Sequence, residues 1–230
     1  MAERVGSTPR RAGRPGPEAG VPDESVVLGR GLEAFAELGY DRASARELAR
    51  RLGVSHNFIN DRYGSKAKFW YAVVDWALEA HQRDRLPLRG ADFDEEQYLR
   101  AVITHFYRRS VDTPLLGRLL ADEFSRESER VDYLYERYIE PELDALAPSI
   151  DRLVAANRMA PVSRDVFFFA VIGPASALIQ NPLAHRLGRP ASETHRDLLH
   201  TAEQLATLIV DGLLATGHSV GAPARHDGRP

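Results

Sequence analysis

The residues best suited to a chemical task lie between 55 and 62, where polar side chains recur at helical spacing. If this segment is helical, Phe58 or Ile59 faces inward together with Tyr63. The side chains that then point outward are those of His56, Asn57, Asn60 and Arg62. An asparagine can bind adenine through two hydrogen bonds, and an arginine can bind guanine in the same way. The pattern predicts a helix that reads base pairs.

Two short helices joined by a tight turn would hold these side chains in place. Ser44 and Glu47 have the spacing of a capping box, which predicts a helix beginning directly after Ser44. Gly53 is suited to end that helix, and Ser55 is suited to cap the next one. The stretch 44–63 therefore has the form of a helix-turn-helix, whose second helix lies in the DNA major groove. A helical hairpin inside a bundle can show the same features, so the flanking residues have to decide.

The flanks make the pattern specific. The helix before the motif closes with Phe35-Ala-Glu-Leu-Gly-Tyr-Asp, and the helix after it opens with Tyr63-Gly-Ser-Lys-Ala-Lys-Phe-Trp. With Leu48-Ala49 and Gly53-Val54-Ser55 between them, residues 24–80 resemble the DNA-binding domain of the tetracycline-repressor (TetR) family. The resemblance implies a small DNA-binding head and a helical body whose interior binds a small ligand. It also implies a dimer in which the last two helices pair with their copies in a second subunit.

The candidate DNA contacts fall into two groups. Arg46 and Asn57 are the best base readers, because they match guanine and adenine. Secondary base contacts are expected from Ser55, His56, Phe58 and Asn60, with Phe58 against a thymine methyl group. Arg62 and Lys66 are expected to hold phosphates, Lys66 together with the amides of its helical turn.

The chain departs from the family pattern at three positions. Ala43 stands where the family often has a threonine, and Asn57 and Asn60 stand where a small residue and an aromatic residue are usual. Asp61 puts a negative charge where phosphates come close, and it either accepts from cytosine or orients Arg62. The operator sequence therefore cannot be carried over from relatives.

The charge of the 230 residues is divided along the chain in a way that suits DNA binding. The net charge is -3, yet residues 1–68 carry 12 Arg and Lys against 9 Asp and Glu. The remaining residues carry 18 against 24, so the basic excess lies where DNA contact is predicted. The absence of cysteine excludes disulfides and thiolate metal sites and fits a reducing cytoplasm, the expected location.

Neither a membrane span nor an enzyme is expected. The uncharged stretch 166–184 is interrupted by Gly173-Pro174, so a buried helix is expected there. The chain lacks the sequence motifs of phosphate-binding loops, nucleophile elbows and zinc peptidases. His195 and His200 are five residues apart, so they do not share a helix face as a zinc pair would. We therefore expect no catalytic residues, no cofactor and no metal site.

The fold class predicted from helical periodicity is all-α, with about nine helices and no strand. An N-terminal three-helix helix-turn-helix DNA-binding domain is expected at 23–84, and a C-terminal helical ligand-binding and dimerisation domain at 92–216. Pro87 and Gly90 mark the break between them. The Arg/Gly/Pro-rich segment 1–22 is expected to be disordered, and either enters the minor groove or only aids solubility. Residues 217–230 are expected to form a flexible tail.

Two sets of residues in the body complete the predictions. Inward-facing aromatic residues form a candidate ligand cavity, namely Phe106, Phe124, Tyr135, Tyr138, Phe167 and Phe168. Small and apolar residues on the last two long helices form a candidate dimer interface, namely Ile172, Ala175, Leu178, Leu198, Ala202, Leu205, Ile209 and Leu213. Either set could instead be plain core of a single subunit.

These features favour a homodimeric, sequence-specific transcriptional regulator. The expected form is a repressor that a small, mostly hydrophobic effector releases from a palindromic operator. Its partners would be double-stranded DNA, a second copy of the chain and an effector whose identity the sequence leaves open. The alternative is a helical module that binds a small molecule or a protein and whose head does not recognise DNA.

Overall fold

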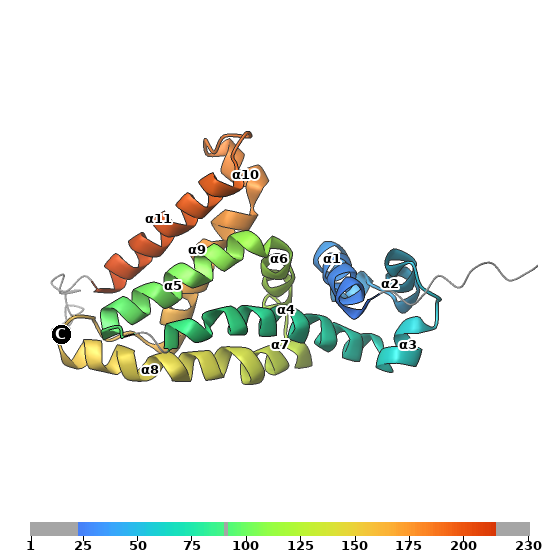
Figure 1. Ribbon diagram of the computed structural model, residues 1–230, viewed down its shortest axis with the longest axis horizontal. Coiled ribbons are helices and arrows are strands. Elements are labelled where there is room, and N and C mark those ends of the chain that lie inside the picture. Colours follow the sequence, from blue (N-terminus) through green and yellow to red (C-terminus); the bar gives the residue numbers. More distant parts are fainter. Residues whose placement is uncertain (1–22, 90–91, 215–230) are drawn as a thin grey trace, which may run out of the picture.

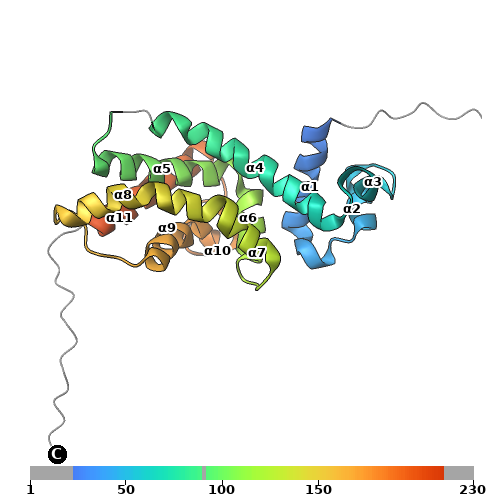
Figure 2. The ribbon, with the colours of Figure 1, turned by 90° about the horizontal axis from the view of Figure 1, so that it is seen from below.

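The computed structural model describes residues 23–89 and 92–214, and all regular structure in that part of the chain is helical. The all-α prediction is confirmed. Figures 1 and 2 show an elongated molecule with α1, α2 and α3 at one end and the remaining helices forming a larger body. The predicted arm at 1–22 and the tail at 217–230 lie outside the described residues.

Four helices build the smaller end of the molecule. They are α1 (Glu24–Arg42), α2 (Ala45–Leu52), α3 (Phe58–Tyr63) and the first part of α4 (Lys66–Arg89). Gly31 lets α1 lie close on α4, because a Cβ atom there would come within 2.7 Å of the Phe69 and Val73 side chains. At Gly39 the backbone turns to φ +71, which ends the regular part of α1 near the predicted position.

The predicted DNA-binding domain ends at residue 84, whereas α4 continues as one helix to Arg89. Pro87 lies within this last stretch of α4. The buried cluster around Val27 and Phe69 also takes in Leu134 and Tyr138 from the body. The two parts of the chain therefore share one hydrophobic core along α4 (Figure 1), and relative movement has to repack that core.

The body is built around α5. Its helices are α5 (Glu95–Asp112), α6 (Pro114–Glu123), α7 (Glu129–Leu134), α8 (Glu140–Ala155), α9 (Arg164–Ile179), α10 (Asn181–Arg186) and α11 (His195–Leu214). α11, α9 and α8 all contact α5. The fully buried Tyr107 hydroxyl on α5 donates a 2.8 Å hydrogen bond to the Val171 carbonyl on α9. The described residues form more than the nine helices predicted, because the short α10 was not predicted and a π turn separates α7 from α8.

A π-helical turn, Tyr135–Ile139, joins α7 to α8. Pro141 lies two residues after the turn and has no N–H to donate to the carbonyl four residues before it. A proline interrupts the hydrogen bonds of a regular α-helix, and the π turn lies directly before this interruption. Pro148 is accommodated inside α8 without a break.

The stripe predicted for the dimer interface faces inward. Ala175, Leu178 and Ala202 are at most 8% exposed and lie in the core of the subunit. The other five predicted residues are partly exposed. They pack against that core or line the body cavity, namely Ile172, Leu198, Leu205, Ile209 and Leu213. The stripe faces inward because α11 packs along α5, so its apolar side is used within one chain.

Candidate nucleic-acid interface and body cavity

The helix-turn-helix begins with a cap that is only half of the predicted capping box. The Ser44 hydroxyl accepts a 3.2 Å hydrogen bond from the Glu47 amide. The Glu47 carboxylate does not reach back, because Arg50 and Arg51 donate hydrogen bonds to it at 2.7 and 3.0 Å. These hydrogen bonds lower the pKa of Glu47 to about 2. Gly53, at φ +71, ends α2 as predicted.

The second helix of the motif begins later than the sequence predicted. Phe58 is its first residue, and Asn57 stands at the cap position without a side-chain hydrogen bond. Ser55 accepts from the Phe58 amide through its backbone carbonyl at 3.0 Å rather than capping with its hydroxyl. Ser55, His56 and Asn57 therefore lie in the turn that precedes α3.

Six of the eight predicted DNA contacts are exposed, and one of these, Arg62, is paired with Glu24. The other five are Arg46, Ser55, His56, Asn57 and Asn60. Among the described residues, none donates or accepts a side-chain hydrogen bond with Arg46, His56 or Asn60. Phe58 is different, because it is half-buried against the core and its ring lies 6.4 Å from that of Tyr63. The exposed set can meet base edges without breaking protein contacts.

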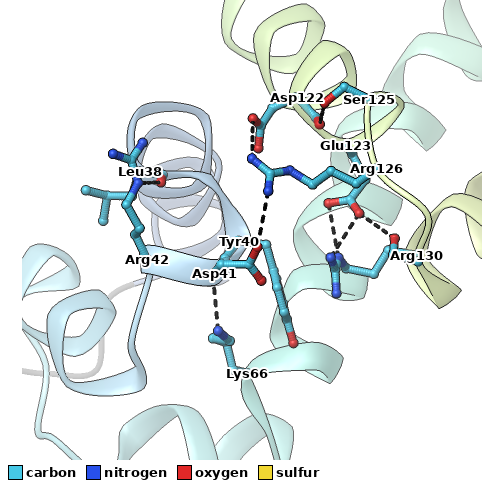
Figure 3. A network of polar contacts seen from close by, with 11 residues as sticks. Leu38, Tyr40, Asp41, Arg42, Lys66, Asp122, Glu123, Ser125, Arg126 and Arg130 are labelled. Atoms are coloured by element: carbon cyan, nitrogen blue, oxygen red, sulfur yellow. Dashed lines mark hydrogen bonds and ion pairs between the residues drawn. The ribbon is translucent and has the colours of Figure 1, made fainter.

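The two residues predicted to hold phosphates are engaged by the protein itself. Arg62 lies 3.3 Å from the Glu24 carboxylate and 6.0 Å from the ring centroids of Phe58 and Tyr63. Lys66 donates a 3.1 Å hydrogen bond to the Tyr40 carbonyl, and its ammonium lies 4.0 Å from the Tyr40 ring centroid (Figure 3). Desolvation by burial lowers the pKa of Lys66.

Tyr40 is also a contact between the head and the body. On its other side the Arg130 guanidinium lies 3.7 Å from the ring centroid. Arg130 in turn pairs at 3.0 Å with Glu123, whose side chain is 3% exposed. Close by, Arg126 bridges Asp41 at 3.3 Å and Asp122 at 3.0 Å (Figure 3). No spacing in the sequence signals the contacts between head and body, because Asp41 and Arg126 lie 85 residues apart.

The body contains a cavity of about 200 Å³ with mostly apolar walls. Of the six aromatic residues predicted to line a cavity, five do so, namely Phe106, Phe124, Tyr138, Phe167 and Phe168. Tyr135 does not, because it is 41% exposed and its hydroxyl donates to Glu140 at 3.2 Å. Polar side chains at the wall include Gln82, His105 and Glu142.

One wall residue is tied directly to α4. The Tyr138 hydroxyl, on the π turn, donates a 2.7 Å hydrogen bond to the Asp75 carboxylate. Tyr133 donates a second one at 2.6 Å, and Arg137 lies 3.5 Å from the same oxygen. Burial and the hydrogen bond to Asp75 raise the pKa of both tyrosines. Asp75 was missed from the sequence, because a single acidic residue on a helix resembles an ordinary surface charge.

Within residues 23–89 and 92–214, no group of three or more His, Cys, Asp or Glu side chains could hold a metal ion. No helix in those ranges is long and apolar enough to cross a membrane.

Comparison with known proteins finds sequence similarity in the head and structural similarity over most of the chain. Residues 27–73 match the family model described as "Bacterial regulatory proteins, tetR family". The chain is 35% identical over 57 residues to YezE of Bacillus subtilis (strain 168), an uncharacterized HTH-type transcriptional regulator. That match covers 25% of this chain and 29% of the relative.

The likeness to solved structures extends over most of the chain. The TetR-family regulator PfmR from Thermus thermophilus superposes with a TM-score of 0.63 at 19% identity, covering 85% of this chain and 99% of that one. The regulator FadR from Bacillus subtilis, in complex with stearoyl-CoA, gives 0.61 at 12% identity, covering 83% and 99%. The head is therefore similar in sequence to regulators of the TetR family, and over most of its length the chain shares the fold of these two regulators.

Proposed function

We propose that the protein is a homodimeric, ligand-responsive repressor that binds a palindromic operator. The observation that carries this proposal is the exposed polar set around the motif, on a head whose helix α4 continues into the wall of the body cavity. Two recognition helices held about 34–36 Å apart would meet successive major grooves on one side of the duplex.

The exposed set supports sequence-specific contact. Asn57 and Asn60 offer amides that match adenine, and Arg46 offers a guanidinium that matches guanine. Arg62 and Lys66 contribute less to phosphate binding in this proposal, because they are held by Glu24 and Tyr40. Base contacts then carry a large share of operator recognition.

The outer faces of α9 and α11 support a dimer. Val166 and Phe169 on α9 are 53% and 65% exposed, and Leu208 on α11 is 69% exposed. Gly173 and Gly212 lie on the same two helices with open space around them, so a second helix could approach closely. We call these five residues the outer α9–α11 surface. It lies on the same two helices as the stripe predicted from the sequence, of which Ala175, Leu178 and Ala202 are buried within the subunit.

The hydrogen bond from Tyr138 to Asp75 supports the link between effector and operator. A ligand in the cavity would contact Tyr138, and Tyr138 binds the helix that carries the head. A ligand that binds more tightly to one position of α4 increases the fraction of molecules in that position. If DNA prefers the other position, the ligand lowers the affinity for DNA.

Selection of duplexes from a randomised pool at moderate salt tests the proposal. We expect an enriched inverted repeat with half-sites about one helical turn apart, bound by two copies of the chain. Fluorescence anisotropy with the enriched duplex and a scrambled one then gives the specificity. No enrichment of any sequence would overturn the proposal and favour a helical binding module.

A further inference from the structure

One largely buried contact joins the end of α1 in the head to α7 in the body. The Arg130 guanidinium on α7 lies 3.7 Å from the ring centroid of Tyr40, near the end of α1. It also lies 5.9 Å from the ring of Trp70, which is 1% exposed. The Arg130 side chain itself is 15% exposed. A cation is attracted to an aromatic ring more strongly where water is largely excluded, so this contact holds the head to the body.

The direction of the Arg130 guanidinium is fixed from within the body. Its Nε donates a 3.0 Å hydrogen bond to one carboxylate oxygen of Glu123, and its Nη2 lies 3.0 Å from the other (Figure 3). The Ser128 hydroxyl donates to the same carboxylate at 2.6 Å. Two parallel contacts leave a planar guanidinium little freedom to turn. Because Glu123 is the last residue of α6, both α6 and α7 hold Arg130 against Tyr40.

The neighbouring ion pairs cross the same boundary but are more exposed. Arg126 meets Asp41 at 3.3 Å and Asp122 at 3.0 Å, and all three side chains are between 42% and 68% exposed. Ion pairs as exposed as these contribute little to stability, because water and salt screen them. Within this network Arg130 is therefore the cation that resists movement of the head.

Movement of the head on the body would separate Tyr40 from Arg130. Helix α1 packs on α6 as well as on α4, so the head is attached along two lines (Figures 1 and 2). A bend or twist of α4 would repack the core along that helix and would also carry the end of α1 away from α7. Because Arg130 is anchored to Glu123, the contact opposes this movement and favours one angle of the head.

We propose that Arg130 is a positioning residue that decides which half-site spacing the dimer accepts. This rests on the proposed binding of a palindromic operator by two copies of the chain. One base pair more or less between the half-sites moves one of them by about 3.4 Å along the duplex and turns it by roughly 35°. In this proposal the heads follow by changing their angle on the body. That change breaks the contact between Arg130 and Tyr40 in at least one subunit, so an operator of altered spacing is bound more weakly.

Two changes remove the contact in different ways. Tyr40→Leu removes the ring and keeps an apolar side chain. The double variant Arg130→Gln with Glu123→Gln removes the cation without leaving a buried charge unpaired. It also leaves the contact of Lys66 with the Tyr40 ring in place, and that contact lies inside the head. An effect shared by both changes therefore belongs to Arg130.

Each change has a matched control. Tyr40→Phe keeps the ring, so the conservative variant should behave as the natural chain does. The double variant Arg152→Gln with Glu95→Gln neutralises an ion pair between α8 and α5, which lies within the body and does not touch the head. It controls for the loss of an Arg–Glu pair as such.

The test is fluorescence anisotropy with the selected operator and with versions one base pair longer and one shorter. We expect the natural chain and both controls to prefer the selected spacing. In Tyr40→Leu and in the Arg130/Glu123 double variant this preference should fall by roughly tenfold, the strength of a cation–ring contact where water is largely excluded. Discrimination among single-base variants within a half-site should stay unchanged, because the side chains that contact bases are not altered.

The readout separates positioning from a purely structural role, since partial unfolding would weaken every duplex alike. An equal loss for every duplex would overturn the inference, and so would a spacing preference that both changes leave intact. A natural chain that selects an operator but is indifferent to its spacing would overturn it as well. The proposed function fails separately, when the natural chain selects no operator at all, and the inference then fails with it.

Discussion

At the scale of single residues, the exposed polar side chains predicted to contact bases have no partners in the described part of the protein, whereas the two neighbouring cations do. Arg46, Asn57 and Asn60 are exposed, so contact with bases costs the protein no internal bond. Arg62 and Lys66 would each have to give up partners to reach a phosphate. The difference leads to separate expectations for the two groups.

Arg46→Ala should weaken binding to the selected operator by about 1–3 kcal/mol and relax specificity at one base pair, because a guanidinium can bind guanine through two hydrogen bonds. Anisotropy with single-base operator variants measures both effects. Arg50→Ala is the control, since Arg50 lies on the same helix but pairs with Glu47. Equal losses on every sequence for both variants would contradict a base-reading role for Arg46.

Lys66→Met should lower the free energy of unfolding by about 0.5–1 kcal/mol, because it removes the ammonium from the Tyr40 ring and carbonyl. The slope of operator affinity against salt should stay unchanged. Urea unfolding and anisotropy at several salt concentrations give the two quantities. A salt slope shallower by about 1 would mean instead that Lys66 reaches a phosphate in the complex.

At the scale of helices, α4 is held at several points along its length. Near its start Lys66 binds the end of α1, and in its middle Asp75 accepts from Tyr133 and Tyr138. Tyr133 lies on α7, and Tyr138 lies on the π turn. π-helical turns are frequent at functional sites. The position of α4 therefore depends on hydrogen bonds that a ligand in the cavity can disturb.

Tyr138→Phe should lower the free energy of unfolding by about 1.5 kcal/mol, because it removes one hydrogen bond to a half-buried carboxylate and keeps the ring. Tyr135→Phe is the matched control and should cost less, since its hydroxyl binds Glu140 at the surface. Urea unfolding measures both variants. Equal costs would mean that the bond to Asp75 adds nothing to the attachment of α4.

Tyr107 should make the protein less stable at alkaline pH. Burial raises the pKa of Tyr107 to about 12, whereas a tyrosine in the unfolded chain ionises near pH 10. The folded state therefore holds a proton that the unfolded state has lost, and stability falls as pH rises from about 10 to 12.

Absorbance titration of the phenolates and urea unfolding across this range check the expectation. Tyr107→Phe should flatten the fall in stability, although it also removes the hydrogen bond to Val171. A fall as steep in the variant as in the natural chain would assign the effect to other tyrosines.

At the scale of the whole molecule, the outer α9–α11 surface should decide the oligomeric state. The double variant Phe169→Glu with Leu208→Glu places charges on its most exposed apolar residues and should give a monomer in light scattering at micromolar concentration. It should also lose most operator affinity, because two heads are needed. Phe93→Glu, at a 41% exposed position that belongs to neither helix, is the control. A monomeric natural chain would contradict the dimer.

The sequence by itself determined the all-helical fold and the helix-turn-helix, together with five aromatic residues of the cavity wall. These features depend on helix caps, a turn glycine and helical periodicity, all of which are visible within short segments of the sequence. It also placed α2 correctly to the residue, because Ser44 and Gly53 bound it on both sides.

Only the tertiary structure decided which face of each helix is used and which polar groups meet. Periodicity marks an apolar stripe on α11 but does not say whether α5 or a second subunit covers it. Likewise Tyr40 meets Arg130, and Asp75 meets Tyr138, across about 90 and 63 residues of chain. Such pairs form when the helices pack, and no local pattern encodes them.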